Sequence, residues 1–174
     1  MLTDKTDWDG LIVIRPMRPE EAATARELVL AVAARLFQPD AVESFMARES
    51  PGLADVDEFE RGYAPPAGLF LVALDGDTVI GTGAIRCLDD DTAELRRMWL
   101  LEPYQGRGIG YRLWRELADF ARRAGYRRVR LTTDTVSTRA ISFYERLGFQ
   151  PITPYNDSND AIFLELELDD HSEN

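Results

Sequence analysis

The first third of the chain changes from an apolar run to an amphipathic stretch and then to a mixed polar segment. Leu11 to Pro16 is a short, β-branched run closed by proline, which predicts a strand. Between Glu20 and Phe37 the apolar residues recur at helical spacing and predict one buried stripe, formed by Ala25, Leu28, Val29, Val32 and Leu36. Gln38 to Pro66 combines many acids with scattered apolar residues and prolines, which predicts one or two short helices and a loop.

The central part of the chain predicts a three-stranded antiparallel meander from Leu69 to Leu101. Two apolar runs meet at Asp75-Gly76-Asp77, and an Asp-Gly pair is typical of the turn in a β-hairpin. The acids Asp89 to Asp91 indicate a second turn before the last run. Counting by two along that last strand predicts two faces, one with Glu94, Arg96, Met98 and Leu100 and the other with Leu95, Arg97, Trp99 and Leu101.

The last third predicts two helices and further strands. Ile109, Leu113, Leu117, Phe120 and Ala124 form a helical stripe that Gly125 ends. Arg127 to Thr133 is strand-like, and Ser137 is the expected N-cap of a helix that ends at Gly148. Ala161 to Leu168 alternates as a half-exposed strand does, and Gln150 to Tyr155 is read as a short strand beside it.

The elements follow the order β-α-(α)-β-β-β-α-β-α-β-β. Helices between the strands of one mixed, mostly antiparallel sheet predict an α/β (α+β) fold with three layers. A chain of 174 residues with 45% hydrophobic content suits one domain with its own core. We place that domain at residues 1–168 and expect residues 169–174 to form a flexible acidic tail.

Charge and composition narrow the classes of partner. The net charge of −11 argues against general nucleic-acid binding, which needs a basic surface. Glu94 to Gln150 departs from this average, with twelve arginines against six acids. Helical spacing predicts that four of these arginines face water, namely Arg112, Arg115, Arg122 and Arg123.

The expected compartment and thiol state follow from three features that the sequence does not show: a membrane span, a signal peptide and a second cysteine. No apolar run approaches the roughly 18 residues of a membrane span, and the first residues do not have the layout of a signal peptide. We therefore expect a soluble, cytoplasmic protein without membrane contact. The single cysteine, Cys87, has no partner within the chain and is expected to be a buried structural thiol.

The stretch Gln105-Gly106-Arg107-Gly108-Ile109-Gly110 lies between a predicted strand and a predicted helix. Amides at the start of a helix have no intrahelical acceptor, and glycine lets a ligand approach the backbone, so this stretch favours a phosphate cradle over a turn that uses glycine for geometry alone. A P-loop would need Gly-Lys followed by Ser or Thr, whereas Tyr111 follows Gly110. A dinucleotide fold would need a different glycine spacing after its first strand.

Three stretches carry a resemblance to a known family. "QGRGIG" resembles the pyrophosphate loop of the GNAT superfamily of acetyl-CoA-dependent N-acetyltransferases, "AELRRMWL" resembles its fourth strand, and "RAISFYERLGF" resembles its later helix. The three motifs are specific for the superfamily and say little about the acceptor. Many members have an asparagine just before the later helix, where this chain has Ser137, so Ser137 either contacts the cofactor or only caps the helix.

The resemblance implies acetyl-CoA as co-substrate, no metal, and a cofactor site at the glycine stretch and the fourth strand. Its residues would be Met98, Trp99, Leu100, Gln105, Gly106, Arg107, Gly108, Ile109, Gly110 and Ser137. In acetyl transfer, an amide near Met98 to Leu100 would bind the carbonyl oxygen as it becomes negative. The resemblance marks Tyr144 as the general acid for the departing thiolate.

The base must be found among the carboxylates. The only histidine, His171, lies in the predicted tail, which makes a histidine base or a histidine metal site improbable. Glu94 is the candidate base, and the equal alternative is an exposed charge at the strand end or an ion-pair partner of Arg96.

The expected function is transfer of acetyl to the amine of a small or amino-acid-like acceptor. The alternatives are a protein or peptide N-acetyltransferase and an acyl-CoA-binding sensor without turnover. The resemblance is also compatible with a homodimer.

Overall fold

Seven strands form one sheet, and their order in space differs from their order in the chain. The computed structural model describes residues 11–38, 42–44, 50–158 and 161–169. Across the sheet the order is β1-β2-β3-β4-β5-β7-β6, and every neighbouring pair is antiparallel except the parallel pair β4 and β5. The strands are β1 (Ile12–Pro16), β2 (Leu69–Asp75), β3 (Thr78–Cys87), β4 (Thr92–Leu100), β5 (Arg128–Asp134), β6 (Gln150–Pro151) and β7 (Ala161–Glu167).

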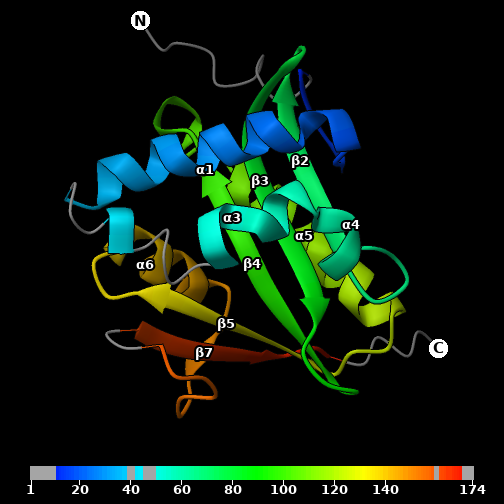
Figure 1. Cartoon of the computed structure of the whole chain (residues 1–174). Coiled ribbons are helices and arrows are strands. Elements are labelled where there is room, and N and C mark those ends of the chain that lie inside the picture. The colour runs from blue at the N-terminus through cyan, green and yellow to red at the C-terminus, as the bar shows by residue number, and fades with distance from the viewer. Residues whose placement is uncertain (1–10, 39–41, 45–49, 159–160, 170–174) are drawn as a thin grey trace, which may run out of the picture.

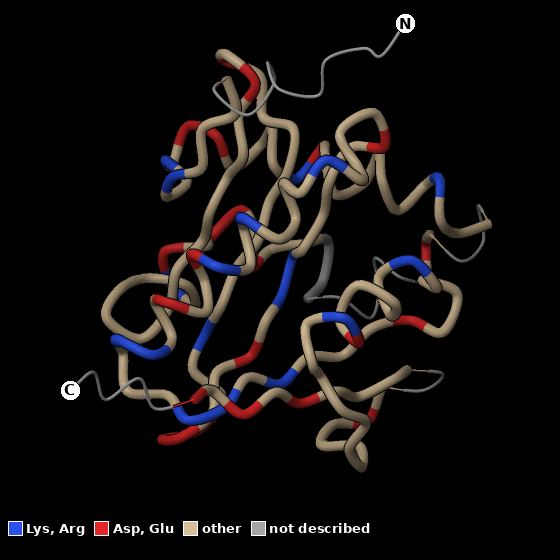
Figure 2. Tube along the Cα trace, turned by 180° about the vertical axis from the view of Figure 1, so that it is seen from behind, with Lys and Arg blue, Asp and Glu red and all other residues tan. Residues whose placement is uncertain are grey.

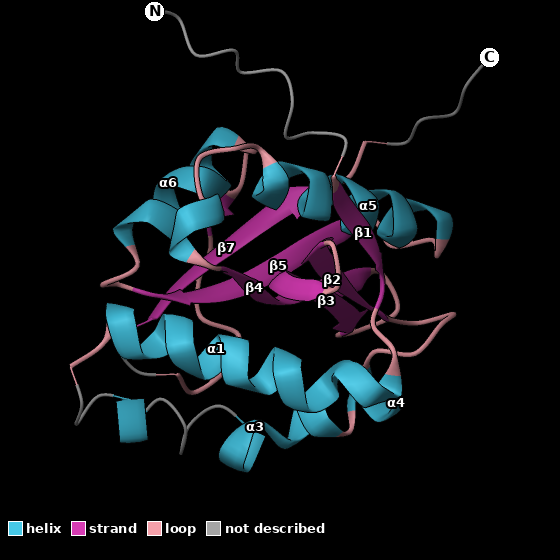
Figure 3. Ribbon diagram, turned by 90° about the horizontal axis from the view of Figure 1, so that it is seen from above, coloured by secondary structure: helices cyan, strands magenta, loops and turns pink. Residues whose placement is uncertain are grey.

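Helices cover both faces of this sheet (Figure 1; Figure 3). One face carries α1 (Ala22–Leu36), α3 (Ser50–Asp57) and α4 (Phe59–Gly62). The other carries α5 (Ile109–Arg123) and α6 (Thr138–Arg146), and two 3-10 turns complete the elements, η1 (Pro19–Glu21) and η2 (Glu102–Tyr104). The predicted fold class, a three-layer domain around a mixed and mostly antiparallel sheet, is confirmed.

Alternation along β2 contributes to a core on each side of the sheet. On β2, Phe70, Val72 and Leu74 pack with α1, whereas Leu71 and Ala73 pack with α5. Fully burying a side chain of this size stabilises the fold by about 1.5–3 kcal/mol. The two layers of helices are therefore held by the same strands, and the strands that diverge elsewhere do so within a rigid frame.

The predicted meander is present as β2, β3 and β4. Asp75 pairs with Thr78 across the first turn, and Asp91 N–H donates to the Asp89 carboxylate within the second. The segment from Gln38 to Pro66 contributes the two short helices α3 and α4, although part of this segment lies outside the described residues. Residues 170–174 of the predicted tail also lie outside them.

Two expectations about exposure were wrong. Cys87 is exposed because it is the last residue of β3, where the strand runs into the turn beyond the cover of the helices; its Sγ lies 3.5 Å from the Asp89 carbonyl oxygen. Of the four arginines expected to face water, Arg112 and Arg122 are only half-exposed. Arg112 donates to the Ile12 carbonyl and Arg122 to Asp119, so both take part in tertiary or local pairing.

The basic segment does not form one basic face. Figure 2 shows the basic and acidic residues interspersed along both strands and helices. Ion pairs such as that between Arg130 and Glu165, at 2.6 Å, account for this mixing on neighbouring strands. Within the described part of the chain, no helix combines the length and apolar content that a membrane span requires.

Candidate active site

The site begins with a β-bulge in β4. Thr82 of β3 pairs with Trp99, and Ala84 pairs with Arg96, so Gly83 alone lies opposite two residues of β4, Arg97 and Met98. Arg97 takes a φ of 55°, in the left-handed region that costs a residue with a Cβ about 1–2 kcal/mol. A bulge of this kind inserts one extra residue and redirects the strand that follows it.

The bulge overturns the predicted alternation of faces on β4. Met98 and Leu100 pack against the same core cluster as Leu95, on the side of α5. Trp99 packs on the side of α1, and the Arg97 side chain reaches α3. Counting by two fails here because the extra residue shifts the pattern by one position.

Gly83 is the residue of β3 that makes room for this arrangement. A Cβ at Gly83 would lie 2.7 Å from the Met98 sulfur and 3.1 Å from Cδ1 of Leu117. The Met98 side chain therefore lies directly over the backbone of β3, in the space that a side chain at position 83 would occupy.

β4 and β5 separate after Glu94, before the chain reaches the bulge. Their parallel pairing covers only Thr92 to Glu94, which face Arg128 to Arg130. From that point the edge of β4 that faces β5 has no strand partner in the described structure, and a cavity of about 740 Å³ occupies the gap. Backbone groups at such an edge need hydrogen-bond partners, from water or from a ligand.

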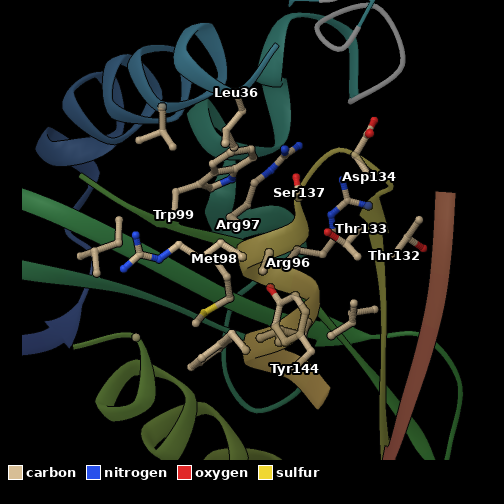
Figure 4. Close-up of a pocket in the computed structure, with 18 of the residues that line it drawn as sticks. Leu36, Arg96, Arg97, Met98, Trp99, Thr132, Thr133, Asp134, Ser137 and Tyr144 are labelled. Carbon is tan, nitrogen blue, oxygen red and sulfur yellow. The ribbon is translucent and has the colours of Figure 1, made fainter. Parts of the chain in front are cut away.

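The walls of this cavity come from both helical layers. Leu36, at the end of α1, lies on one side of β4, and Tyr144 of α6 lies on the other (Figure 4). Leu36 was predicted within the buried stripe of α1, but it is 45% exposed because the last turn of the helix borders the cavity. Thr132, Thr133 and Asp134 line the opposite wall from β5.

The glycine loop closes one end of the cavity. Gly106 and Gly108 have φ values of 76° and 80°, and a Cβ built at Gly108 would have no neighbour within 4 Å. Gly108 is the N-cap of α5, and among the described residues none accepts a hydrogen bond from the amides of the first turn, 109–111. The dipole of a 15-residue helix adds partial positive charge at this point.

Arg139, in the first turn of α6, approaches the loop from the other side of the cavity. Its Nη2 would lie 3.4 Å from a Cβ built at Gly106. Open backbone amides, a helix N-terminus and a guanidinium thus converge on one space. This donor set fits a diphosphate, the group that coenzyme A would place there.

Three residues of the glycine motif that were predicted to bind the cofactor have side chains that contact other parts of the protein. The Gln105 side-chain amide donates to the Leu100 carbonyl at 2.9 Å, which ties the loop to the end of β4. The Arg107 side chain is exposed and lies over the Tyr104 ring at 5.6 Å. The Ile109 side chain belongs to the core, where it is 3% exposed. Among these three residues, only Gln105 lines the cavity.

Glu94 lies where β4 and β5 begin to separate and lines the cavity, although only 3% of it is exposed. Its closest ion pair is with Arg86, at 2.7 Å, whereas the expected partner Arg96 is 3.9 Å away. The Tyr155 hydroxyl donates to its other oxygen at 3.3 Å, and Thr132 donates to that hydroxyl at 3.1 Å. Both hydroxyls are thus oriented so that protons can move toward the carboxylate.

Burial, with the negative charge of Glu94 nearby, raises the pKa of Tyr155 to about 12. Tyr155 therefore keeps its proton at neutral pH. It can act as a relay between Thr132, which lines the cavity, and Glu94.

Tyr144 and Ser137 both line the cavity from α6 and its start. The Tyr144 hydroxyl is directed toward β4 (Figure 4), and among the described residues none forms a hydrogen bond with it. Burial raises the pKa of the Tyr144 hydroxyl above its ordinary value, so it is protonated at neutral pH. Ser137 occupies the N-cap position, but its side chain makes no capping hydrogen bond, contrary to that prediction.

The structure adds residues that the sequence did not reveal. Asp55 of α3 binds Arg97 across 42 positions of the chain, a separation that leaves no local signal. Burial alone would raise the pKa of the Asp55 carboxyl, but the hydrogen bonds and charge of Arg97 outweigh it and hold that pKa below its ordinary value. Arg139 is the first residue of the stretch that resembles the later helix of the family, and no role was predicted for it. The described residues contain no cluster of three or more potential metal ligands.

Comparison with known proteins agrees with this geometry. The model of the acetyltransferase (GNAT) family matches residues 25–149. The chain belongs to the GNAT family. The uncharacterized N-acetyltransferase YjgM of Escherichia coli is 31% identical over 127 residues, which are 70% of this chain and 76% of that protein.

Two further proteins are similar to this chain. N-acetylaspartate synthetase of Danio rerio is 37% identical over 100 residues, 56% of this GNAT chain and 36% of that protein. The chain thus spans about a third of the length of this curated relative. The crystal structure of the PaiA N-acetyltransferase of Thermoplasma acidophilum, a complex with coenzyme A, covers 90% of this chain and 98% of its own, with a TM-score of 0.71 and 23% identity. The predicted family is therefore confirmed, and the solved structure shows the same fold.

Proposed function

We propose that this GNAT protein transfers an acetyl group from acetyl-CoA to the amine of a small, amino-acid-like acceptor. The observation that carries the proposal is the gap between β4 and β5. It joins an unpaired strand edge, a glycine loop at a helix N-terminus and a buried, protonated tyrosine in one cavity. Each of the three features answers one need of acetyl transfer from a thioester.

The cofactor would lie along β4 with its diphosphate at the glycine loop. The amides of the first turn of α5, with Gly106, Gly108 and the Arg139 guanidinium, would bind the diphosphate. The pantetheine amides would pair with the free edge of β4 at Met98 to Leu100, as a strand would. Ser137 lines the same wall and is a candidate for a further contact.

In the reaction, the amine nitrogen attacks the acetyl carbon, so a C–N bond forms and the C–S bond breaks. Backbone amides of β4 stabilise the oxygen that becomes negative, and removing one such donor from an enzyme costs about 10²–10³ in kcat. The amine proton passes through Thr132 and Tyr155 to Glu94. The electron pair of the broken bond leaves on sulfur as a thiolate.

Tyr144 is suited to protonate that thiolate. Its hydroxyl faces β4 and has no hydrogen-bond acceptor in the described part of the chain. Its raised pKa keeps the hydroxyl protonated until the thiolate forms. Burial also disfavours the thiolate and raises the pKa of the leaving thiol, so the thiolate takes up a proton more readily than it would in water.

The lining of the cavity supports an acceptor that carries a carboxylate. Arg96, Trp99 and Leu36 all line the cavity, so it offers both a cation and apolar surface. A guanidinium recognises a carboxylate well. The name of the relative N-acetylaspartate synthetase, which denotes an N-acetylated amino acid, supports the same class of acceptor.

The acceptor class is tested by release of free coenzyme A from acetyl-CoA in the presence of aspartate, leucine or the corresponding amino acid amides. We expect faster release with the free acids, and Arg96→Gln should raise KM for the acids while leaving KM for the amides unchanged. Better turnover with peptide N-termini would favour the protein acetyltransferase instead. Tight acetyl-CoA binding without any acceptor-dependent thiol would identify a sensor and contradict catalysis.

The diphosphate cradle is tested by Gly108→Asp. A carboxylate about 4 Å from a phosphate charge opposes binding by roughly 4 kcal/mol at a protein surface, so acetyl-CoA affinity should fall about 100-fold or more. Gly108→Asn is the matched control, because asparagine has the same shape and tolerates a positive φ. Calorimetry should show a much smaller loss for Asn, and unchanged affinity of the Asp variant would overturn the cradle.

The general acid is tested by Tyr144→Phe. Loss of the proton donor should lower kcat by roughly 100-fold, at the low end of what general acids contribute, and leave the Kd for acetyl-CoA unchanged. Tyr126→Phe is the control, since the Tyr126 hydroxyl donates to the Ala67 carbonyl outside the cavity. If Tyr144→Phe turns over at the wild-type rate, Tyr144 serves only packing.

A further inference from the structure

The left-handed conformation of Arg97 requires an explanation. A glycine would adopt a φ of 55° readily, yet an arginine stands at this position of the bulge. Strained residues of this kind persist only where their surroundings determine them. Several contacts to Arg97 do so.

The Arg97 side chain forms a buried, two-pronged ion pair with Asp55 of α3. Nε donates to Oδ2 at 2.9 Å and Nη2 donates to Oδ1 at 2.7 Å. The two side chains are 2% and 12% exposed. Tyr63 directly follows α4, and its hydroxyl donates to the same carboxylate at 2.8 Å. Asp55 is therefore itself fixed. The planar fork of arginine sets orientation as well as distance.

The backbone of Arg97 is held at the same time from the opposite strand. The Thr82 hydroxyl donates to the Arg97 carbonyl at 2.7 Å, and Thr82 is fully buried. The side chain and the carbonyl of Arg97 are therefore both held in place, and these contacts determine its backbone φ and ψ angles. Met98, Trp99 and Leu100 follow immediately, so that rotation also sets the direction of their amides.

We propose that the Arg97–Asp55 ion pair positions the catalytic backbone: it holds Arg97 in the left-handed bulge and thereby aims the amides of Met98 to Leu100 at the thioester. The inference rests on the proposed function for its catalytic consequence, but not for its geometry. It makes Arg97 and Asp55 positioning residues. It also links α3, on the face of the sheet that carries α1, to the strand that would hold the cofactor.

The first test is Asp55→Asn, which removes the charge while preserving the shape. Misplacement of reacting groups by about 1 Å can cost 10²-fold in rate, so we expect kcat to fall roughly 10- to 100-fold. Asp57→Asn is the matched control on the same helix, because Asp57 pairs with Arg26 at the surface and does not contact β4. This control should keep the wild-type kcat.

The second test separates positioning from other roles by adding Arg97→Gly to Asp55→Asn. Glycine takes the left-handed conformation without an ion pair, as in bulges that have glycine at this position. We therefore expect the double variant to regain most of the lost kcat, although its melting temperature stays low. If the double variant is as slow as Asp55→Asn, or slower, Arg97 acts by direct contact and the proposal is wrong.

A readout that does not depend on turnover completes the test. The backbone amide resonances of Met98 and Trp99 should shift in Asp55→Asn, return toward wild type in the double variant, and stay unchanged in Asp57→Asn. If Asp55→Asn fails to fold, Arg97→Lys keeps the charge without the fork, and should displace the same resonances and lower kcat. Unmoved resonances with a lower melting temperature would show a purely stabilising pair and overturn the proposal. If the resonances respond as expected but no acetyl transfer is found, the proposed function fails and the geometric inference stands.

Discussion

The parting of β4 from β5 after Glu94 is the constraint on which the rest of the structure depends. A buried strand edge without a neighbour leaves amide and carbonyl groups that need partners, and such groups are costly to leave unpaired. Here that edge runs along a cavity that ends at the open amides of the α5 N-terminus. A ligand with amides along its length and a diphosphate at one end satisfies both, which is the chemistry of coenzyme A.

The bulge in β4 sets the geometry of this edge. One extra residue opposite Gly83 moves Met98 to the side of α5 and leaves Trp99 on the side of α1, so one strand serves both walls of the site. The strain at Arg97 is offset by an ion pair to α3 and a hydrogen bond from Thr82. Replacing a buried ion pair with apolar residues is often neutral or stabilising, so the pair makes better sense as a means of fixing geometry than as a source of stability.

Much of the fold could be predicted because it follows from periodicity. The alternation of β2, the stripes of α1 and α5, and the Asp75-Gly76 turn are local patterns, and the glycine loop carries its chemistry in six consecutive residues. Features that depend on contacts distant in sequence could not be predicted. The bulge changes which residues of β4 share a face. Asp55, which pairs with Arg97, lies in a segment without a clear pattern, and Glu94 pairs more closely with Arg86 of the neighbouring strand than with Arg96. Cys87 lies two positions beyond Ile85, the last buried residue of β3, which strand propensity alone does not show.

A crystal structure of the chain with acetyl-CoA tests the central claim most directly. The account predicts pantetheine between β4 and β5, hydrogen-bonded to the β4 backbone, with the diphosphate at Gly106 to Gly110 and the thioester sulfur beside the Tyr144 hydroxyl. Acetyl-CoA bound outside this gap, or a gap closed by pairing of β4 with β5 beyond Glu94, would contradict it.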